Sequence, residues 1–208
     1  INCAVELARR SPDITPKMLD RIESDVQKLD SLVGDLLTYT RLNAEVSIPF
    51  SEIDVSEIVE DIADNASLEG DARKIQVICD LPKDDLIMTG NADLLAHAIE
   101  NVVRNALRFS PDGGKVTIQG GMVSDSSLQI SVQDEGPGIP QEEMAKIFDP
   151  FFRGANQATG SGYGLRLPIT MQAAQHHGGT VHAENILPHG LKITITLPLK
   201  PAGKSEIA

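Results

Sequence analysis

The sequence predicts an α/β fold, a two-layer sandwich in which a mixed β-sheet carries helices on one face. Over residues 15–43 apolar side chains recur every three or four positions, which is the period of an amphipathic helix. From residue 50 onward short alternating stretches are interspersed with helical patterns, and the later stretches can pair as antiparallel hairpins. Helices and hairpins mixed in this way favour one sheet covered by helices, with a separate helical segment in front of it.

The first 45 residues are predicted to be helical. Residues 1–10 are expected to end a first helix, residues 11–13 to turn, and Thr15 before Pro16 to begin a second helix that runs to about Asn43. The apolar seam of this helix consists of Met18, Ile22, Val26, Leu29, Val33, Leu36 and Leu37. So narrow a seam is typical of a four-helix bundle, so two hairpins are expected to pair in a homodimer. It would also suit an amphipathic helix packed on its own domain.

The remaining elements are expected in residues 46–200. Strands are predicted at 50–54, 75–79, 86–88, 115–119, 128–134, 181–184 and 191–197, and helices after Asp54 or Ser56, after Asn91, after Pro140 and after Gly164. Residues 120–121 and a polar turn at 124–126 are expected to join two of the strands. We therefore predict a helical segment at 1–45, a second domain at 46–200 and a disordered tail at 201–208.

Composition excludes several classes of protein. With 18 basic and 30 acidic residues the net charge is −12, which argues against a nucleic-acid-binding surface. Two cysteines are too few for a disulfide framework, and no apolar run is long enough to span a membrane. The chain starts without Met or a signal-peptide pattern, so we expect a piece of a longer protein.

The helix predicted after Asn91 carries a first polar motif. Asn101 and Asn105 are four residues apart and project from one face, and their amide oxygens suit Mg²⁺. Arg108 and Phe109 follow one turn later, where a cation could meet phosphate and an aromatic ring could meet a base. The same residues would also suit an ordinary polar helix surface.

Two further motifs follow the strand predicted at 128–134. Asp134 ends that strand and could accept a hydrogen bond from an exocyclic amino group, while Gly136 and Gly138 let the backbone turn before Ile139. An ordinary Gly-Pro turn is the alternative. Residues 147–154 then gather three aromatic side chains, among them Phe148, before Arg153. This stretch could be a hinge or a plain hydrophobic anchor.

A glycine-rich stretch precedes the last predicted helix, with Gly160, Ser161, Gly162, Tyr163, Gly164 and Leu165 in sequence. Backbone of this kind that enters a helix N-terminus can form a phosphate-binding concavity. It matches neither the P-loop nor the dinucleotide pattern, and a flexible linker is the alternative.

In this order the four motifs resemble the N, G1, F and G2 boxes of sensor histidine kinases, within the Bergerat group of ATP-binding proteins. The resemblance covers about residues 50–199, and the N-terminal helices resemble part of a dimerisation and histidine-phosphotransfer hairpin. It implies an ATP-binding domain in which Asn105 binds Mg²⁺, Asn101 lies beside the phosphates and Asp134 reads adenine. It also implies Gly160, Gly162 and Gly164 at the phosphate-facing end of an ATP lid.

The resemblance further implies a protein-histidine kinase with a response-regulator partner, as the cytoplasmic part of a bacterial inner-membrane protein. The five histidines are His97, His176, His177, His182 and His189, and none lies in the helical segment. The phospho-accepting histidine is therefore expected upstream of Ile1, and this chain alone is not expected to phosphorylate itself. His177 is expected to be structural, and Arg166 to face solvent. Another ATPase of the group, with Glu100 as its base, and a nucleotide-sensing scaffold remain alternatives.

Overall fold

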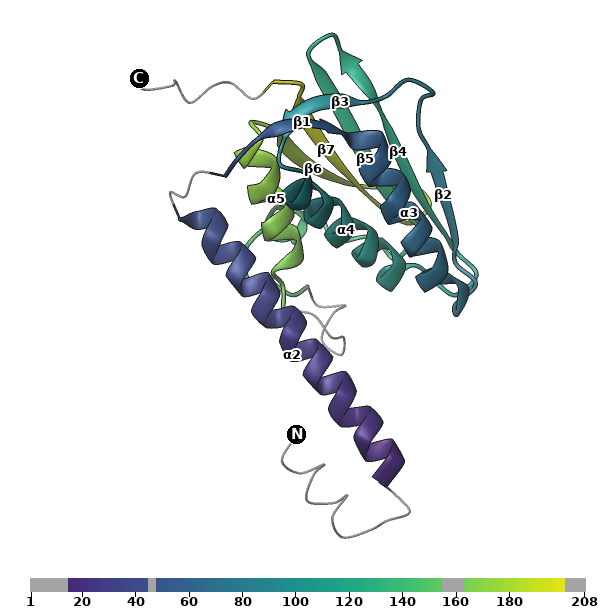
Figure 1. Ribbon diagram of the computed structural model, residues 1–208. Helices are drawn as coiled ribbons and strands as arrows, with labels where there is room; N and C mark the ends of the chain where they lie inside the picture. The colour runs from purple at the N-terminus through teal and green to yellow at the C-terminus, as the bar shows by residue number, and fades with distance from the viewer. Residues whose placement is uncertain (1–14, 45–47, 155–162, 201–208) are drawn as a thin grey trace.

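The computed structural model describes residues 15–44, 48–154 and 163–200, and Figure 1 shows a long helix projecting from an α/β domain. The helix is α2 (Thr15–Asn43), with the bounds that the periodicity predicts. No helix in the described ranges is long and apolar enough to cross a membrane. The predicted helix at 1–10, the turn at 11–13 and the tail at 201–208 lie outside the described residues. The domain boundary near residue 45 stays a prediction.

Five strands form the main sheet, in the order β2-β4-β5-β7-β6. Their bounds are β2 Gln76–Asp80, β4 Lys115–Ser124, β5 Ser127–Asp134, β6 Thr180–Asn185 and β7 Leu191–Pro198. The β2–β4 pair is parallel and the other pairs are antiparallel, so the sheet is mixed, as predicted. A separate antiparallel ribbon consists of β1 (Ser51–Asp54) and β3 (Ile87–Gly90).

The helices of the domain lie together on one face of the main sheet (Figure 1). They are α3 (Val55–Asp71), α4 (Ala92–Phe109) and α5 (Arg166–His176). The Asn91 side chain accepts from the Leu94 N–H at 2.9 Å, so it caps α4 as its residue type predicts. The buried faces of α3 and α4 and the inward side chains of the sheet form one aliphatic core. The predicted two-layer sandwich is therefore confirmed.

A smaller apolar cluster attaches α2 to this domain. Leu42 of α2 is buried with Leu94 and Ala98 of α4, and with Leu165 and Ile169 at the start of α5. The Nε2 of His176 also lies 2.7 Å from the Leu42 carbonyl oxygen. The last turns of α2 therefore pack against the α/β domain, whereas many of its earlier apolar positions remain exposed.

Two local predictions need correction. Gly120 and Gly121 lie inside β4 and pair with Ile130 and Gln129 of β5, because the ladder continues past them to the turn at 124–126. The helix expected after Pro140 is only the 3₁₀ turn η2 (Met144–Lys146). The Pro168 ring falls in the first turn of α5, where the missing N–H breaks no helical hydrogen bond.

Candidate functional site

Helix α4 carries a row of polar side chains along one of its faces. Asn101 is buried, with 5% of its surface exposed, and its Nδ2 has no hydrogen-bond partner in the described part of the chain. Asn105 and Arg108 follow along the same face and are half-buried. A buried amide left without a partner costs about 1–3 kcal/mol, so Asn101 marks a position that a ligand can complete.

Asp134 stands where β5 ends, with only 6% of its surface exposed. Its Oδ1 accepts hydrogen bonds from the N–H of Gly136 at 2.8 Å and of Leu191 at 3.1 Å. Burial raises the pKa of the carboxyl, and the two backbone hydrogen bonds oppose this rise. Among the described residues Oδ2 has no hydrogen-bond partner, so it can accept from a ligand.

The loop after Asp134 packs tightly against the end of α4. A Cβ on Gly136 would stand 2.8 Å from the Phe109 carbonyl oxygen, and Gly138 has a φ of +70° that favours glycine. Asn185 fixes the next residue, because its Oδ1 accepts from the Ile139 N–H at 2.9 Å and its Nδ2 donates to the Ile139 carbonyl at 2.7 Å. Close packing at Gly136 thus brings the Asp134 carboxylate next to the backbone of Phe109.

Arginines supply positive charge to this acidic chain. The Arg108 guanidinium lies 5.1 Å from the centre of the Phe109 ring. Burial lowers the Arg108 pKa, and the charges of Arg166 and Arg153 lower it further. The three cations are therefore near enough to form one positive field. Arg166 was expected to face solvent, but it is half-buried and lines a pocket with Asn101, because α5 begins beside α4.

The third motif ends before residues 155–162, and the fourth motif continues after them. The two motifs contact each other across this segment. Phe148 packs against the main core, and Arg153 is exposed. The Phe151 N–H donates to the Gly164 carbonyl oxygen at 2.9 Å, so residues on either side of 155–162 are joined. Gly160, Ser161 and Gly162 lie outside the described residues, and their predicted contacts stay predictions.

Two further residues of the glycine-rich motif differ in exposure. Tyr163 is 42% exposed, which leaves its ring accessible. Leu165 is 1% exposed, and its side chain fills the cluster between α2, α4 and α5. Its side chain is therefore turned into the domain, and the prediction that Leu165 takes part in ATP binding, through its backbone, stays a prediction. Packing against Leu42 and Leu94 explains why a leucine stands there.

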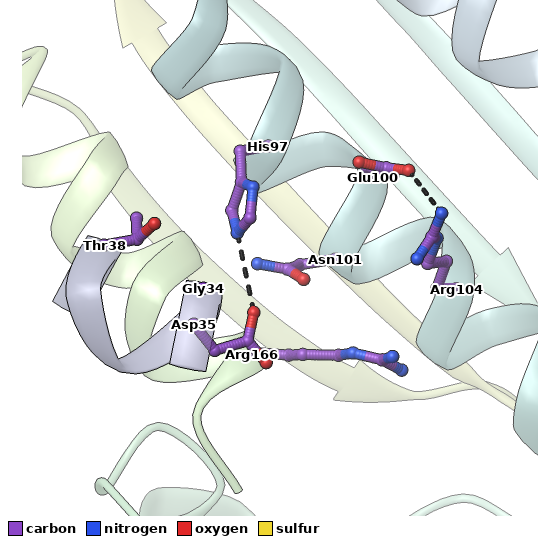
Figure 2. Close-up of a pocket in the computed structure, with 8 residues that line it drawn as sticks. All are labelled: Gly34, Asp35, Thr38, His97, Glu100, Asn101, Arg104 and Arg166. Atoms are coloured by element: carbon purple, nitrogen blue, oxygen red, sulfur yellow. Dashed lines mark ion pairs between the residues drawn. The ribbon is translucent and has the colours of Figure 1, made fainter. Parts of the chain in front are cut away.

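A pocket of about 180 Å³ lies where α2, α4 and the start of α5 meet (Figure 2). It is lined by Gly34, Asp35, Thr38, His97, Glu100, Asn101, Arg104 and Arg166. Asp35 Oδ1 lies 3.8 Å from His97 Nε2, and Arg104 pairs with Glu100 at 2.8 Å. Among these residues, only Asn101 has a role that the resemblance to sensor histidine kinases predicts. Helical spacing could have placed His97 one turn before Asn101, but nothing local brings Asp35 to it.

His177 is structural, as predicted. It is fully buried and stacks on Phe50 with ring centres 4.8 Å apart. Its Nε2 accepts from the Asn91 N–H at 3.0 Å, so Nδ1 carries the proton and donates to the Ala173 carbonyl at 2.7 Å. Burial lowers the pKa of this ring and keeps it neutral.

The predicted metal ligand of this site is the neutral amide oxygen of Asn105. No group of three or more His, Cys, Asp or Glu side chains within the described ranges could hold a metal ion. The amide of Asn105 is a weak ligand alone, but it suits Mg²⁺ that also keeps waters and phosphate oxygens. The residues therefore fit a metal that arrives with a nucleotide.

Comparison with known proteins places this chain in a family. Residues 90–201 match the histidine kinase-, DNA gyrase B- and HSP90-like ATPases. Sensor histidine kinase CpxA of Escherichia coli (strain K12) is 36% identical over 195 residues, which cover 93% of this chain and 42% of CpxA. The chain thus spans less than half the length of that relative.

Solved structures agree with the sequence match. The mycobacterial sensor histidine kinase MprB superposes with a TM-score of 0.66 and 28% identity, over 73% of this chain and 99% of MprB. Histidine kinase ThkA, in its complex with the response regulator protein TrrA, has the same fold, with a TM-score of 0.74, 23% identity, and coverage of 92% and 53%. The chain therefore belongs to the histidine kinase-, DNA gyrase B- and HSP90-like ATPase family and carries the ATP-binding catalytic domain of a sensor histidine kinase.

Proposed function

We propose that Asp134 selects adenine and that the polar face of α4 binds the phosphates of ATP. This proposal rests on the different surroundings of the two oxygens of the Asp134 carboxylate. Two backbone N–H groups orient Oδ1, while Oδ2 of the same buried side chain has no partner in the described chain. An oriented acceptor on a largely buried carboxylate suits the 6-amino group of adenine. Phe109, at the adjoining end of α4, is placed to contact the base.

The remaining binding roles follow from position and charge. Asn101 and Asn105 project from α4 beside Arg108, so their amides can bind phosphate oxygens and a Mg²⁺ ion carried by them. Arg108 and Arg153 offset phosphate charge. Gly136, Gly138 and Gly164 let the backbone pack closely beside the proposed nucleotide site, and Gly160, Ser161, Gly162 and Tyr163 are proposed to close over the nucleotide. Mg²⁺ would neutralise phosphate charge during transfer.

The proposed reaction is transfer of the γ-phosphoryl group of ATP to a histidine nitrogen. An N–P bond forms while the bond from the γ-phosphorus to the bridging oxygen breaks, and ADP leaves. The residues described here hold and orient the nucleotide for this step. We propose that the acceptor histidine belongs to a dimerisation helix of the longer protein, and that a response-regulator receiver domain then takes the phosphoryl group. The proposed setting is the cytoplasmic side of a bacterial inner membrane.

The alternative of a hydrolytic ATPase is less well supported. A general base for water would have to be Glu100, one residue from the phosphate-facing Asn101. Glu100 instead pairs with Arg104 at 2.8 Å on the same helix, where both side chains are about half exposed. Because the Glu100 carboxylate is directed at Arg104, it is not oriented toward an attacking water, and we retain the kinase assignment.

Exchange of one atom in Asp134 tests the adenine assignment. In Asp134→Asn the Oδ1 acceptor is kept, but an NH₂ donor replaces Oδ2 and faces the adenine amino group. Because an unpaired buried donor costs about 1–3 kcal/mol, ATP affinity should fall about tenfold to a hundredfold. Inosine triphosphate presents a carbonyl at that position and should bind the variant better than ATP does.

Calorimetric titration of both nucleotides with Mg²⁺ gives the two affinities. Asp125→Asn, in the exposed turn between β4 and β5, removes the same charge far from the site and should change neither. Equal ATP affinity in Asp134→Asn and the native chain would remove the adenine assignment.

A further inference from the structure

The pocket between α2, α4 and α5 holds two buried polar atoms that have no hydrogen-bond partner among the described residues. Asn101 Nδ2 is buried without a partner in the described part of the chain, and Figure 2 shows the amide directed into the space beside Asp35 and Arg166. His97 Nε2 is also buried without a hydrogen bond. The Asn101 amide N–H is a donor, and His97 Nε2 is one when it carries the ring proton, so the pocket favours an anion with several acceptor oxygens.

In the structure the carboxylate of Asp35 occupies the space beside these two groups. Its side chain is 13% exposed, and its Oδ1 lies 3.8 Å from His97 Nε2, beyond hydrogen-bond distance. It has no hydrogen bond within the described ranges. A largely buried carboxylate so poorly paired gains little there, so its position beside two unused donors is a weak contact that a better anion could replace.

Arg166 contributes a positive charge that is not paired with a described acidic residue. Its guanidinium makes no ion pair with a described residue, whereas the neighbouring Glu100 is already paired with Arg104. Figure 2 shows the Arg166 side chain extended beneath Asn101. The effect of Arg166 on the Arg108 pKa also indicates that its charge reaches the phosphate-binding face of α4.

We propose that Asn101 and Arg166 form a subsite for a terminal phosphate of the nucleotide, and that Asp35 of α2 competes with that phosphate for the pocket. This inference rests on the proposed binding of ATP. The guanidinium and the amide donate to phosphate oxygens, which the Asp35 carboxylate would repel in the same space. By linkage, phosphate binding and the docking of α2 must weaken each other by the same factor.

The first test measures affinities of the whole chain for Mg²⁺-ATP, ADP and AMP by calorimetry. Arg166→Gln should weaken ATP about tenfold and leave AMP unchanged, because one charge-assisted contact to the terminal phosphate is lost. Arg166→Lys should recover part of the ATP affinity. Lys83→Gln removes an equal charge from the exposed loop between β2 and β3 and should leave all three affinities unchanged.

The second test removes the competing charge. Asp35→Asn keeps the shape of the side chain and should strengthen ATP binding about threefold to tenfold while AMP binding stays constant. Asp30→Asn, on an exposed turn of the same helix, controls for the general loss of negative charge. In Asp35→Asn/Arg166→Gln the gain should shrink, because the phosphate no longer meets the arginine.

The outcomes separate the two proposals. If no adenine nucleotide binds the native chain, the proposed function fails. If nucleotides bind but Arg166→Gln changes ATP and AMP equally, or Asp35→Asn leaves ATP affinity as it was, the phosphate subsite is wrong and the function stands. Circular dichroism of each variant confirms that it is folded, and the Lys variant decides the case if Gln does not fold.

Discussion

The Phe151 N–H donates to the Gly164 carbonyl oxygen at 2.9 Å and joins the two ends of the segment that contains the glycine-rich motif. Gly164 has a φ of +71°, and a Cβ built on it would stand 2.5 Å from the Phe152 carbonyl oxygen. Both the backbone angle and the space therefore demand glycine. This contact fixes where the proposed lid leaves the domain and where it returns.

We predict that Gly164→Ala weakens ATP binding. An alanine in the left-handed region costs about 1–2 kcal/mol, and the added methyl must also push the Phe151–Phe152 backbone away. The base of the lid should open, so ATP affinity should fall at least about tenfold and the melting temperature should drop by several degrees. Calorimetry and thermal unfolding followed by circular dichroism measure the two effects.

Gly121→Ala is the matched control. Gly121 lies in β4, has no positive φ, and a Cβ there would meet nothing within 4 Å. Its melting temperature and ATP affinity should equal those of the native chain. A Gly164→Ala variant that behaves like this control would contradict the structural role of the glycine.

We predict that Asp134→Asn does not lose stability at neutral pH. Burial raises the pKa of the Asp134 carboxyl above its ordinary value of 3.8, so its protonated form is favoured in the folded state. The stability that this group contributes is complete below pH 3.8 and is lost as the pH rises through the folded-state pKa. The asparagine has no such loss.

Urea unfolding near neutral pH should therefore give Asp134→Asn a free energy of unfolding equal to or above that of the native chain. Asn keeps the Oδ1 acceptor for Gly136 and Leu191, so the loop is preserved. Together with a weaker affinity for ATP, this would identify Asp134 as a residue kept for binding at the expense of stability. A clearly destabilised variant would mean that the carboxylate holds the loop.

Local patterns predicted the elements well, because each depends on neighbours in sequence. The Asn91 cap, the alternation in β7 and the glycines after Asp134 all express constraints within a few residues. The connection predicted at Gly120 and Gly121 was wrong, because glycine is typical of turns. Only their pairing with β5 shows that they belong to a strand.

The parts that sequence missed depend on how separate elements pack. Arg166 faces the pocket because α5 begins against α4, and the Leu165 side chain is buried because α2 covers it. Asp35 and His97 are 62 positions apart in the numbering and meet only in the fold. No spacing rule connects residues on different helices, so the pocket could not have been predicted.

We predict that stability falls on acidification because of His177. Burial lowers the pKa of this ring below 6.5, and its neutral form bonds Asn91 and Ala173. Its contribution is complete above pH 6.5 and is lost as the pH falls toward the folded-state pKa, because the unfolded chain takes up a proton first. The free energy of unfolding should therefore decrease between about pH 7 and pH 5.

His177→Gln provides the comparison, since an amide oxygen can accept from the Asn91 N–H but does not titrate. Its free energy of unfolding should depend less on pH over that interval than that of the native chain. The exposed His182 serves as control, and His182→Gln should keep the native slope. An unchanged slope in His177→Gln would assign the pH dependence to other groups.

We predict that Asn105→Ala removes the contribution of Mg²⁺ to nucleotide binding. Amide oxygen is a neutral ligand, so the metal should bind only together with phosphate, and Mg²⁺ alone should give no heat on titration. In the native chain, EDTA should weaken ATP binding but leave adenosine binding unchanged. In Asn105→Ala, ATP binding with and without EDTA should be equal, and an effect of EDTA that persists would place the metal elsewhere.

We predict that the exposed face of α2 mediates dimerisation. Val26, Leu29, Val33 and Leu36 are 43–52% exposed at helical spacing, whereas Leu42 on the same helix is buried against the catalytic domain. Apolar side chains repeated along one stripe gain free energy when a second helix covers them. Sedimentation equilibrium should therefore give a dimer that dissociates on dilution.

Val33→Glu/Leu36→Glu should yield a monomer at every concentration, because two carboxylates per chain would be buried in the interface. Leu68→Glu, which changes a 74% exposed leucine on α3, should remain a dimer and excludes a general effect of charge. A native chain that stays monomeric at high concentration would mean that α2 alone cannot hold two copies together. A dimer that survives the double substitution would place the interface on another surface of the domain.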